Sequence, residues 1–114
     1  MMGQMYRDGL GVKQSYEMAR MLFGLATHQG DASAMYDLGF MYYKGQGVEQ
    51  SYEKAVEYYE QAAHLGHAKA QYNLGHMYCN GLGVERDLKK AKELWTKAAA
   101  QGQKNAIKNL KLIN

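Results

Sequence analysis

The internal pattern of the sequence is clearest at residues 70–84, which read Ala-Gln-Tyr-Asn-Leu-Gly-His-Met-Tyr-Cys-Asn-Gly-Leu-Gly-Val. When the sequence is shifted by 36 residues, many of its glycines, tyrosines and alanines align with residues of the same type. The aligned sets include Gly3, Gly39 and Gly75; Tyr6, Tyr42 and Tyr78; and Ala19, Ala55 and Ala91. A fixed period of this length is typical of a solenoid, in which each unit buries its apolar face against its neighbours.

Each repeat unit predicts two helices. Apolar residues recur at helical spacing between residues 34 and 42, and again between residues 52 and 63. A short oxygen-bearing side chain precedes each second helix, where it can accept a hydrogen bond from a free backbone N–H of the first turn. Each unit ends at a glycine, which adopts the left-handed conformation of a helix terminus without steric penalty. The predicted N-caps are Ser15, Ser51 and Asp87, and the closing glycines are Gly30, Gly66 and Gly102.

The length of 114 residues suits one domain with one core. We predict a single all-α solenoid domain over residues 1–114. Its parts are a first repeat at 1–30, a second at 31–66, a third at 67–102 and a capping helix at 103–114. Because Met1 lies just before the repeat glycine, we expect repeat 1 to lack most of its first helix, either because the chain is a fragment of a longer array or because the first repeat is frayed. Lys104, Lys108 and Lys111 would give the capping helix a polar surface, as the end of a solenoid requires.

The residues at 70–84, followed by Lys90-Ala91, Trp95 and Lys97-Ala98-Ala99, closely resemble the Sel1-like repeat, a relative of the tetratricopeptide repeat. The 36-residue period and the doubled Gly-x-Gly-Val loop distinguish it from the tetratricopeptide repeat of about 34 residues. The resemblance implies a right-handed superhelix of antiparallel helix pairs. It also implies a protein–protein interaction role, because members of the family are mostly adaptors and scaffolds. Leu88 occupies the position that is tyrosine in the other two repeats, at Tyr16 and Tyr52. This difference leaves the predicted fold unchanged.

We predict that a protein or peptide partner binds the concave face, which the first helix of each unit would line. On these first helices, the residues that do not face the core differ from one repeat to the next. Several of them are aromatic, and aromatic residues are favoured at protein-binding hot spots. The predicted partner-binding residues are Arg7, Tyr36, Phe40, Tyr43, Lys44, Lys69, Tyr72 and His76. Tyr36 and Tyr72 are equivalent positions, so an equally good interpretation makes them partly core residues.

One alternative function is hydrolysis of β-lactam-like amides. Ser51 and Lys54 have the Ser-x-x-Lys spacing of penicillin-binding enzymes, but the accompanying Ser-Asp-Asn and Lys-Thr-Gly motifs are missing. Ser51 and its equivalents in the other repeats are predicted helix caps. The residue equivalent to Lys54 in the first repeat is Met18, which cannot play the part of the lysine. We therefore expect no enzymatic activity and no catalytic residue.

A second alternative is binding of an acidic partner or a nucleic acid through the basic C-terminal third. Residues 1–84 carry a net charge of −2, whereas residues 85–114 carry +5. Lysines are also what exposed helix faces ordinarily carry. Most of these lysines are predicted on the second helix and the cap, outside the concave face, so we rank nucleic-acid binding last.

The sequence predicts no cofactor, metal or membrane segment. The Gly-x-Gly loops lack the preceding strand and the further glycine or Gly-Lys-Ser/Thr ending of a nucleotide-binding loop. His64 and His67 are separated by Gly66 and have no further ligand nearby. Cys79 is the only cysteine, and no apolar run approaches the roughly 18 to 20 residues that span a bilayer. We therefore expect a soluble protein, with the cytoplasm as the favoured compartment.

Overall fold

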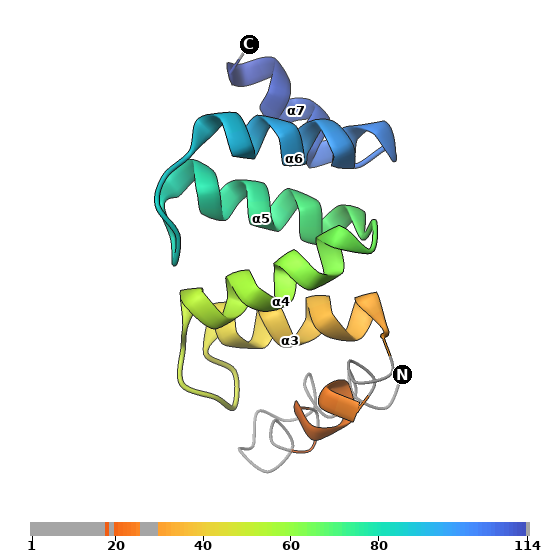
Figure 1. The fold of residues 1–114 in the computed structure, drawn as a ribbon, viewed down its shortest axis with the longest axis vertical. Helices are drawn as coiled ribbons and strands as arrows, with labels where there is room; N and C mark the ends of the chain where they lie inside the picture. The colour runs from red at the N-terminus through yellow and green to blue at the C-terminus, as the bar shows by residue number, and fades with distance from the viewer. Residues whose placement is uncertain (1–17, 19, 26–29, 114) are drawn as a thin grey trace.

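The computed structural model describes residue 18, residues 20–25 and residues 30–113, and the regular structure in these ranges is helical. The helices stack one after another along the molecule, from α3 near one end to α7 at the other (Figure 1). Their bounds are α3 Ala32–Lys44, α4 Tyr52–His64, α5 Ala68–Asn80, α6 Leu88–Ala100 and α7 Lys104–Ile113. The predicted all-α solenoid of helix pairs with a terminal helix is confirmed.

Several sequence-based predictions concern the N-terminal segment and fall outside the described residues. They include the N-cap at Ser15 and the partner-binding role of Arg7. Within the described ranges, no helix is long and apolar enough to cross a membrane.

The second helices α4 and α6 are capped as predicted. The Ser51 Oγ accepts a hydrogen bond of 3.2 Å from the Lys54 backbone N–H, and Asp87 Oδ1 accepts one of 3.1 Å from Lys90. Gly66 then closes α4, with a φ of 87°. Its N–H donates to Ala63 and the following N–H of His67 donates to Ala62, which satisfies two carbonyls that the helix end would otherwise leave free.

The first helix of each pair is also capped, by residues that sequence analysis did not identify. Asp31 Oδ1 accepts from the N–H groups of Ser33 and Ala34 at 2.9 and 3.2 Å. At the equivalent positions, His67 Nδ1 accepts from Ala70 at 3.2 Å and Gln103 Oε1 accepts from Ala106 at 2.8 Å. The role of His67 is therefore that of a helix cap.

Two helical glycines allow the helices of a pair to approach closely. A Cβ atom on Gly39 would lie 2.7 Å from the Tyr59 ring, and one on Gly75 would lie 2.5 Å from Trp95 Nε1. Both rings are almost completely buried, with exposed fractions of 1% and 3%. The glycines thus make room for the large aromatic side chains that fill the space between helices.

A third close approach joins neighbouring repeats. Gly83, in the loop after α5, has a φ of 71°, and a Cβ atom there would lie 2.5 Å from the backbone carbonyl carbon of Tyr52. The loop of repeat 3 therefore packs directly on the first turn of α4 in repeat 2.

Replacing Gly75 with alanine tests the close contact with Trp95. The added methyl group collides with a buried ring, so we expect Gly75→Ala to lower the free energy of unfolding by about 1–3 kcal/mol. Gly24 is a matched control, since it is helical and a Cβ there would meet nothing within 4 Å. Gly24→Ala should instead raise stability by up to about 1 kcal/mol through helix propensity. Equal stability of the two variants in urea unfolding would contradict this account.

Replacing His67 tests its role as a cap through pH. Burial, aided by the charge of Lys69, lowers the pKa of His67 below its ordinary 6.5. The unfolded chain then binds this proton more readily than the folded chain, so stability should fall as the pH drops below about 6.5, until the folded-state pKa is passed. His67→Asn keeps an acceptor without a titrating ring, and its melting temperature should depend less on pH between 7.5 and 5. His67→Ala loses the cap, at a cost of about 1 kcal/mol. Identical pH slopes for wild type and His67→Asn would rule out the mechanism.

Candidate functional site

A pocket of about 310 Å³ lies between α3 and α5, with one residue of α4 also lining it. The lining residues are Phe40, Tyr43 and Lys44 from α3; Tyr59 from α4; and Tyr72, Asn73, His76 and Met77 from α5. Within each first helix they are three or four residues apart, which places them on one side of the helix. The pocket therefore brings together five predicted partner-binding residues: Phe40, Tyr43, Lys44, Tyr72 and His76. We call it the aromatic pocket.

Of the other three predicted residues, the structure describes Tyr36 and Lys69, and neither lines the pocket. Tyr36 adjoins the pocket, because its ring centroid is 6.5 Å from that of Phe40 and 5.7 Å from that of Tyr59. Lys69 is exposed on α5 and does not line the pocket. Arg7 falls outside the described residues. Tyr36 and Tyr72 are half-buried and pack against core clusters, so both also serve the core, as the alternative interpretation held.

Contacts with neighbouring rings fix the orientation of the aromatic side chains. Tyr43 packs against Tyr52 with ring centroids 5.5 Å apart, and Tyr72 packs against Trp95 at 6.4 Å. The Lys44 ammonium lies 5.8 Å from the centre of the Phe40 ring, within range of a cation–π interaction. Lys44 is itself exposed, so its positive charge is available at the edge of the pocket.

Two further residues line the pocket that were not among the predicted partner-binding residues, Tyr59 and Asn73. The Tyr59 hydroxyl is fully buried, and the Asn73 side chain is its polar neighbour. Burial raises the pKa of Tyr59 well above its ordinary value, and the neighbouring Asn73 amide offsets part of the rise. The Asn73 amide donates to the Tyr36 hydroxyl across 3.4 Å. The sequence signal for Tyr59 is a side chain with a polar tip within the apolar pattern of residues 52–63.

The only permanently charged residue that lines the aromatic pocket, among the residues that the structure describes, is a lysine. None of its lining residues carries a carboxylate, while Lys44 carries a positive charge. His76 also lines the pocket, with Nδ1 3.2 Å from the Asn80 amide nitrogen. Such a site favours an apolar or aromatic group accompanied by negative charge.

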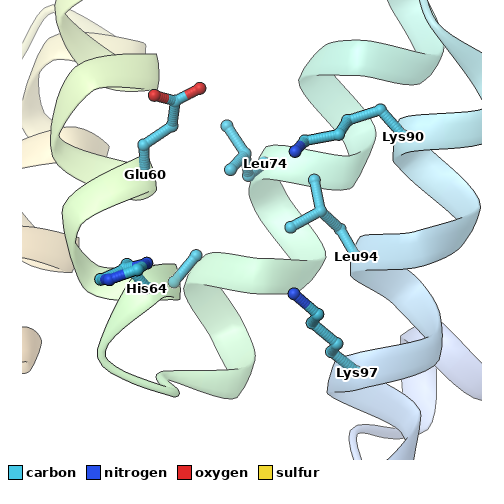
Figure 2. A pocket seen from close by; sticks show the side chains of 7 residues that line it. Glu60, His64, Leu74, Lys90, Leu94 and Lys97 are labelled. Atoms are coloured by element: carbon cyan, nitrogen blue, oxygen red, sulfur yellow. The ribbon is translucent and has the colours of Figure 1, made fainter.

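A second pocket, of about 240 Å³, lies between α4 and α6 over Leu74 of α5 (Figure 2). Glu60 and His64 line it from α4, and Lys90 and Lys97 line it from α6. The Tyr78 hydroxyl donates to Glu60 Oε1 at 2.9 Å, and burial together with this carboxylate raises the pKa of Tyr78 to about 12. The four charged or ionisable lining residues are exposed and of mixed sign, and none was a predicted site residue.

The residues of the hydrolase alternative have structural roles. Ser51 Oγ caps α4, and the Lys54 ammonium lies 5.3 Å from the centre of the Tyr42 ring. The Gly-x-Gly segments are turns, since Gly45, Gly47, Gly81 and Gly83 all have positive φ. In the part of the chain that the structure describes, there is no group of three or more His, Cys, Asp or Glu residues able to hold a metal ion.

The sequence model of the Sel1 repeat family matches the chain three times, at residues 1–31, 32–67 and 68–103. A Sel1 repeat protein from Oxalobacter formigenes is 34% identical and superposes with a TM-score of 0.88, covering 96% of this chain and 45% of that one. A protective antigen of uropathogenic Escherichia coli with an SLR fold is 35% identical, with a TM-score of 0.90 over 98% of this chain and 24% of that one. The chain thus spans less than half the length of each of these two proteins.

Helicobacter pylori cysteine-rich protein B has the same fold at 22% identity, with a TM-score of 0.80 over 94% of this chain and 90% of that one. No curated protein matches the chain. The repeat matches cover almost all of the sequence, and two of the similar structures exceed 30% identity. The chain therefore belongs to the Sel1 repeat family.

Proposed function

We propose that this protein holds a peptide or protein partner on the face formed by α3 and α5, with the aromatic pocket as the main contact. The Sel1 repeat family is a class of helical-repeat scaffolds that generally mediate protein–protein interactions. The observation that carries the proposal for this chain is the gathering of Phe40, Tyr43 and Tyr72 around one pocket. We further propose that residues 1–114 act in this role as one domain.

The pocket has the properties of a binding hot spot. The rings of Phe40, Tyr43 and Tyr72 are partly exposed, and contacts with Tyr52 and Trp95 already hold two of them in place. Side chains ordered before binding lose little conformational entropy when a partner arrives. Aromatic residues in such a setting contribute most of the binding energy of many interfaces.

The aromatic pocket is a more suitable contact than the pocket between α4 and α6. A partner gains most from covering apolar rings whose positions are fixed, whereas exposed ion pairs contribute little. The α4–α6 pocket is bordered by Glu60, Lys90 and Lys97, all of which are well solvated. No observation favours hydrolysis or nucleic-acid binding over partner binding.

Removing two rings from the aromatic pocket tests this proposal. The double variant Phe40→Ala/Tyr43→Ala should weaken binding of a captured partner by at least about 30-fold, since truncation of a single hot-spot residue typically costs about 2 kcal/mol or more. Capture on immobilised protein, followed by calorimetry with the purified partner, provides the measurement.

The matched control is Tyr42→Ala/Tyr58→Ala, which removes two half-buried rings that stack on each other 5.8 Å apart outside the pocket. Both double variants should lose some thermal stability, but only the first should lose the partner. Retained binding in Phe40→Ala/Tyr43→Ala, or an equal loss in the control, would refute the assignment of this face.

A further inference from the structure

We propose that His67 is a pH-sensitive clamp on the aromatic pocket. Its neutral ring holds α3, α4 and α5 together beside the pocket, and protonation of the ring releases this contact and weakens partner binding. This inference rests on the function proposed above and concerns the regulation of the same site.

His67 lies where three helices meet. Its backbone N–H donates to the Ala62 carbonyl at 3.1 Å and so helps to close α4. Its side-chain Nδ1 accepts from the Ala70 N–H at 3.2 Å, which caps the start of α5. Its ring stacks on that of Tyr36 in α3, with the two centroids 4.9 Å apart. The same three helices supply the residues that line the aromatic pocket.

Tyr36 connects His67 to the pocket. The centroid of its ring lies 6.5 Å from that of Phe40 and 5.7 Å from that of Tyr59, and both of these residues line the pocket. The Asn73 amide, on the α5 side of the pocket, donates to the Tyr36 hydroxyl across 3.4 Å. Closely packed side chains pass a displacement on to their neighbours. A movement of Tyr36 therefore changes contacts on both the α3 and the α5 walls.

Protonation of the His67 ring removes its role as a cap. Because Nδ1 accepts a hydrogen bond from a backbone N–H, it carries no proton of its own. An imidazolium has an N–H at both ring nitrogens and cannot accept. Its positive charge is also unfavourable at the start of α5, where the helix dipole favours negative charge. The charged ring therefore turns away from the first turn of α5, which also breaks its present stacking on Tyr36.

The groups around His67 place this change in mildly acidic solution. Burial is the main cause that lowers the pKa of His67 below its ordinary 6.5, and the charge of Lys69 on α5 adds to the effect. Asp31, which caps α3, acts in the opposite direction. His64 stands in the last turn of α4, the helix that His67 follows. Partner binding should therefore be constant above about pH 6.5 and weaken as the pH falls through the folded-state pKa.

The equivalent caps of the neighbouring repeats do not have this property. Asp31 caps α3, and Gln103 accepts from the N–H of Ala106 in the first turn of α7. Of these three types of side chain, only imidazole ordinarily changes its charge between pH 5 and 8. The cap that can switch begins α5, the helix that carries Tyr72 and His76 to the pocket.

The test uses a probe peptide, selected at pH 7.5 from a random nonapeptide library for binding to the full chain. Only peptides that no longer bind Phe40→Ala/Tyr43→Ala are kept, so that the probe reports on the aromatic pocket. The probe has blocked ends and no Asp, Glu or His, so its own charge is constant over the range studied. Its affinity should fall about fivefold between pH 7.5 and 5, the effect of losing one helix cap.

Two histidine variants assign this fall to one residue. His67→Asn keeps an acceptor at the start of α5 but cannot gain a proton, so its affinity should change by less than about twofold over the same range. His76→Gln is the control, because His76 is a second histidine and lines the pocket directly. It should keep the fivefold fall, whatever its affinity at pH 7.5. A fall that persists in His67→Asn, or that disappears in His76→Gln, overturns the inference.

A second measurement follows the free protein by NMR and needs no partner. As the His67 ring gains its proton, the ring signals of Phe40 and Tyr43 should shift with the same midpoint, because the clamp acts on the pocket through Tyr36. These shifts should be absent in His67→Asn. Protonation of His67 without any change at Phe40 and Tyr43 overturns the inference.

The outcomes separate this inference from the proposed function. If the affinity of the wild type for the probe does not depend on pH, the clamp is overturned, whereas the loss of binding in Phe40→Ala/Tyr43→Ala still supports the proposed function. If no library peptide distinguishes the wild type from Phe40→Ala/Tyr43→Ala, the proposed function is contradicted, and with it the effect of the clamp on binding.

Discussion

The contact between a helical glycine and a large aromatic ring determines how the two helices of a pair lie against each other. Gly39 and Gly75 lack the one atom that would keep Tyr59 and Trp95 away from the backbone of the first helix. The rings therefore fill the space between helices almost completely, and the distance within each pair is fixed. The same contact prepares the candidate site, because the ring that presses on Gly39 also lines the aromatic pocket.

The features of the fold that could be predicted are those in which one position demands one type of residue. Positive φ at Gly66 requires glycine, and the caps at Ser51 and Asp87 use side chains that are common at that position. The caps at His67 and Gln103 could not be predicted in the same way, because histidine and glutamine are not preferred caps. Each accepts a hydrogen bond from the backbone N–H three residues further on, as Asp31 does from Ala34.

The candidate site was predictable to the extent that it depends on helical spacing. Phe40 with Tyr43 and Tyr72 with His76 lie on the same side of their helices, so a pattern within each helix was enough to group them. Tyr59 and Asn73 could not be found by that rule. Both line the pocket only because α3, α4 and α5 meet there, and that contact does not follow from local sequence.

The packing of Gly83 on the first turn of α4 constrains how such a chain can change in evolution. The loop of one repeat touches the backbone of the repeat before it, at a place where a side chain cannot be accommodated. Duplication or loss of one whole 36-residue unit restores this junction, because the glycine returns to the same position relative to its neighbour. An insertion or deletion of any other length moves it out of register. Arrays of this kind can therefore grow or shrink by complete units, while the length of each unit stays constant.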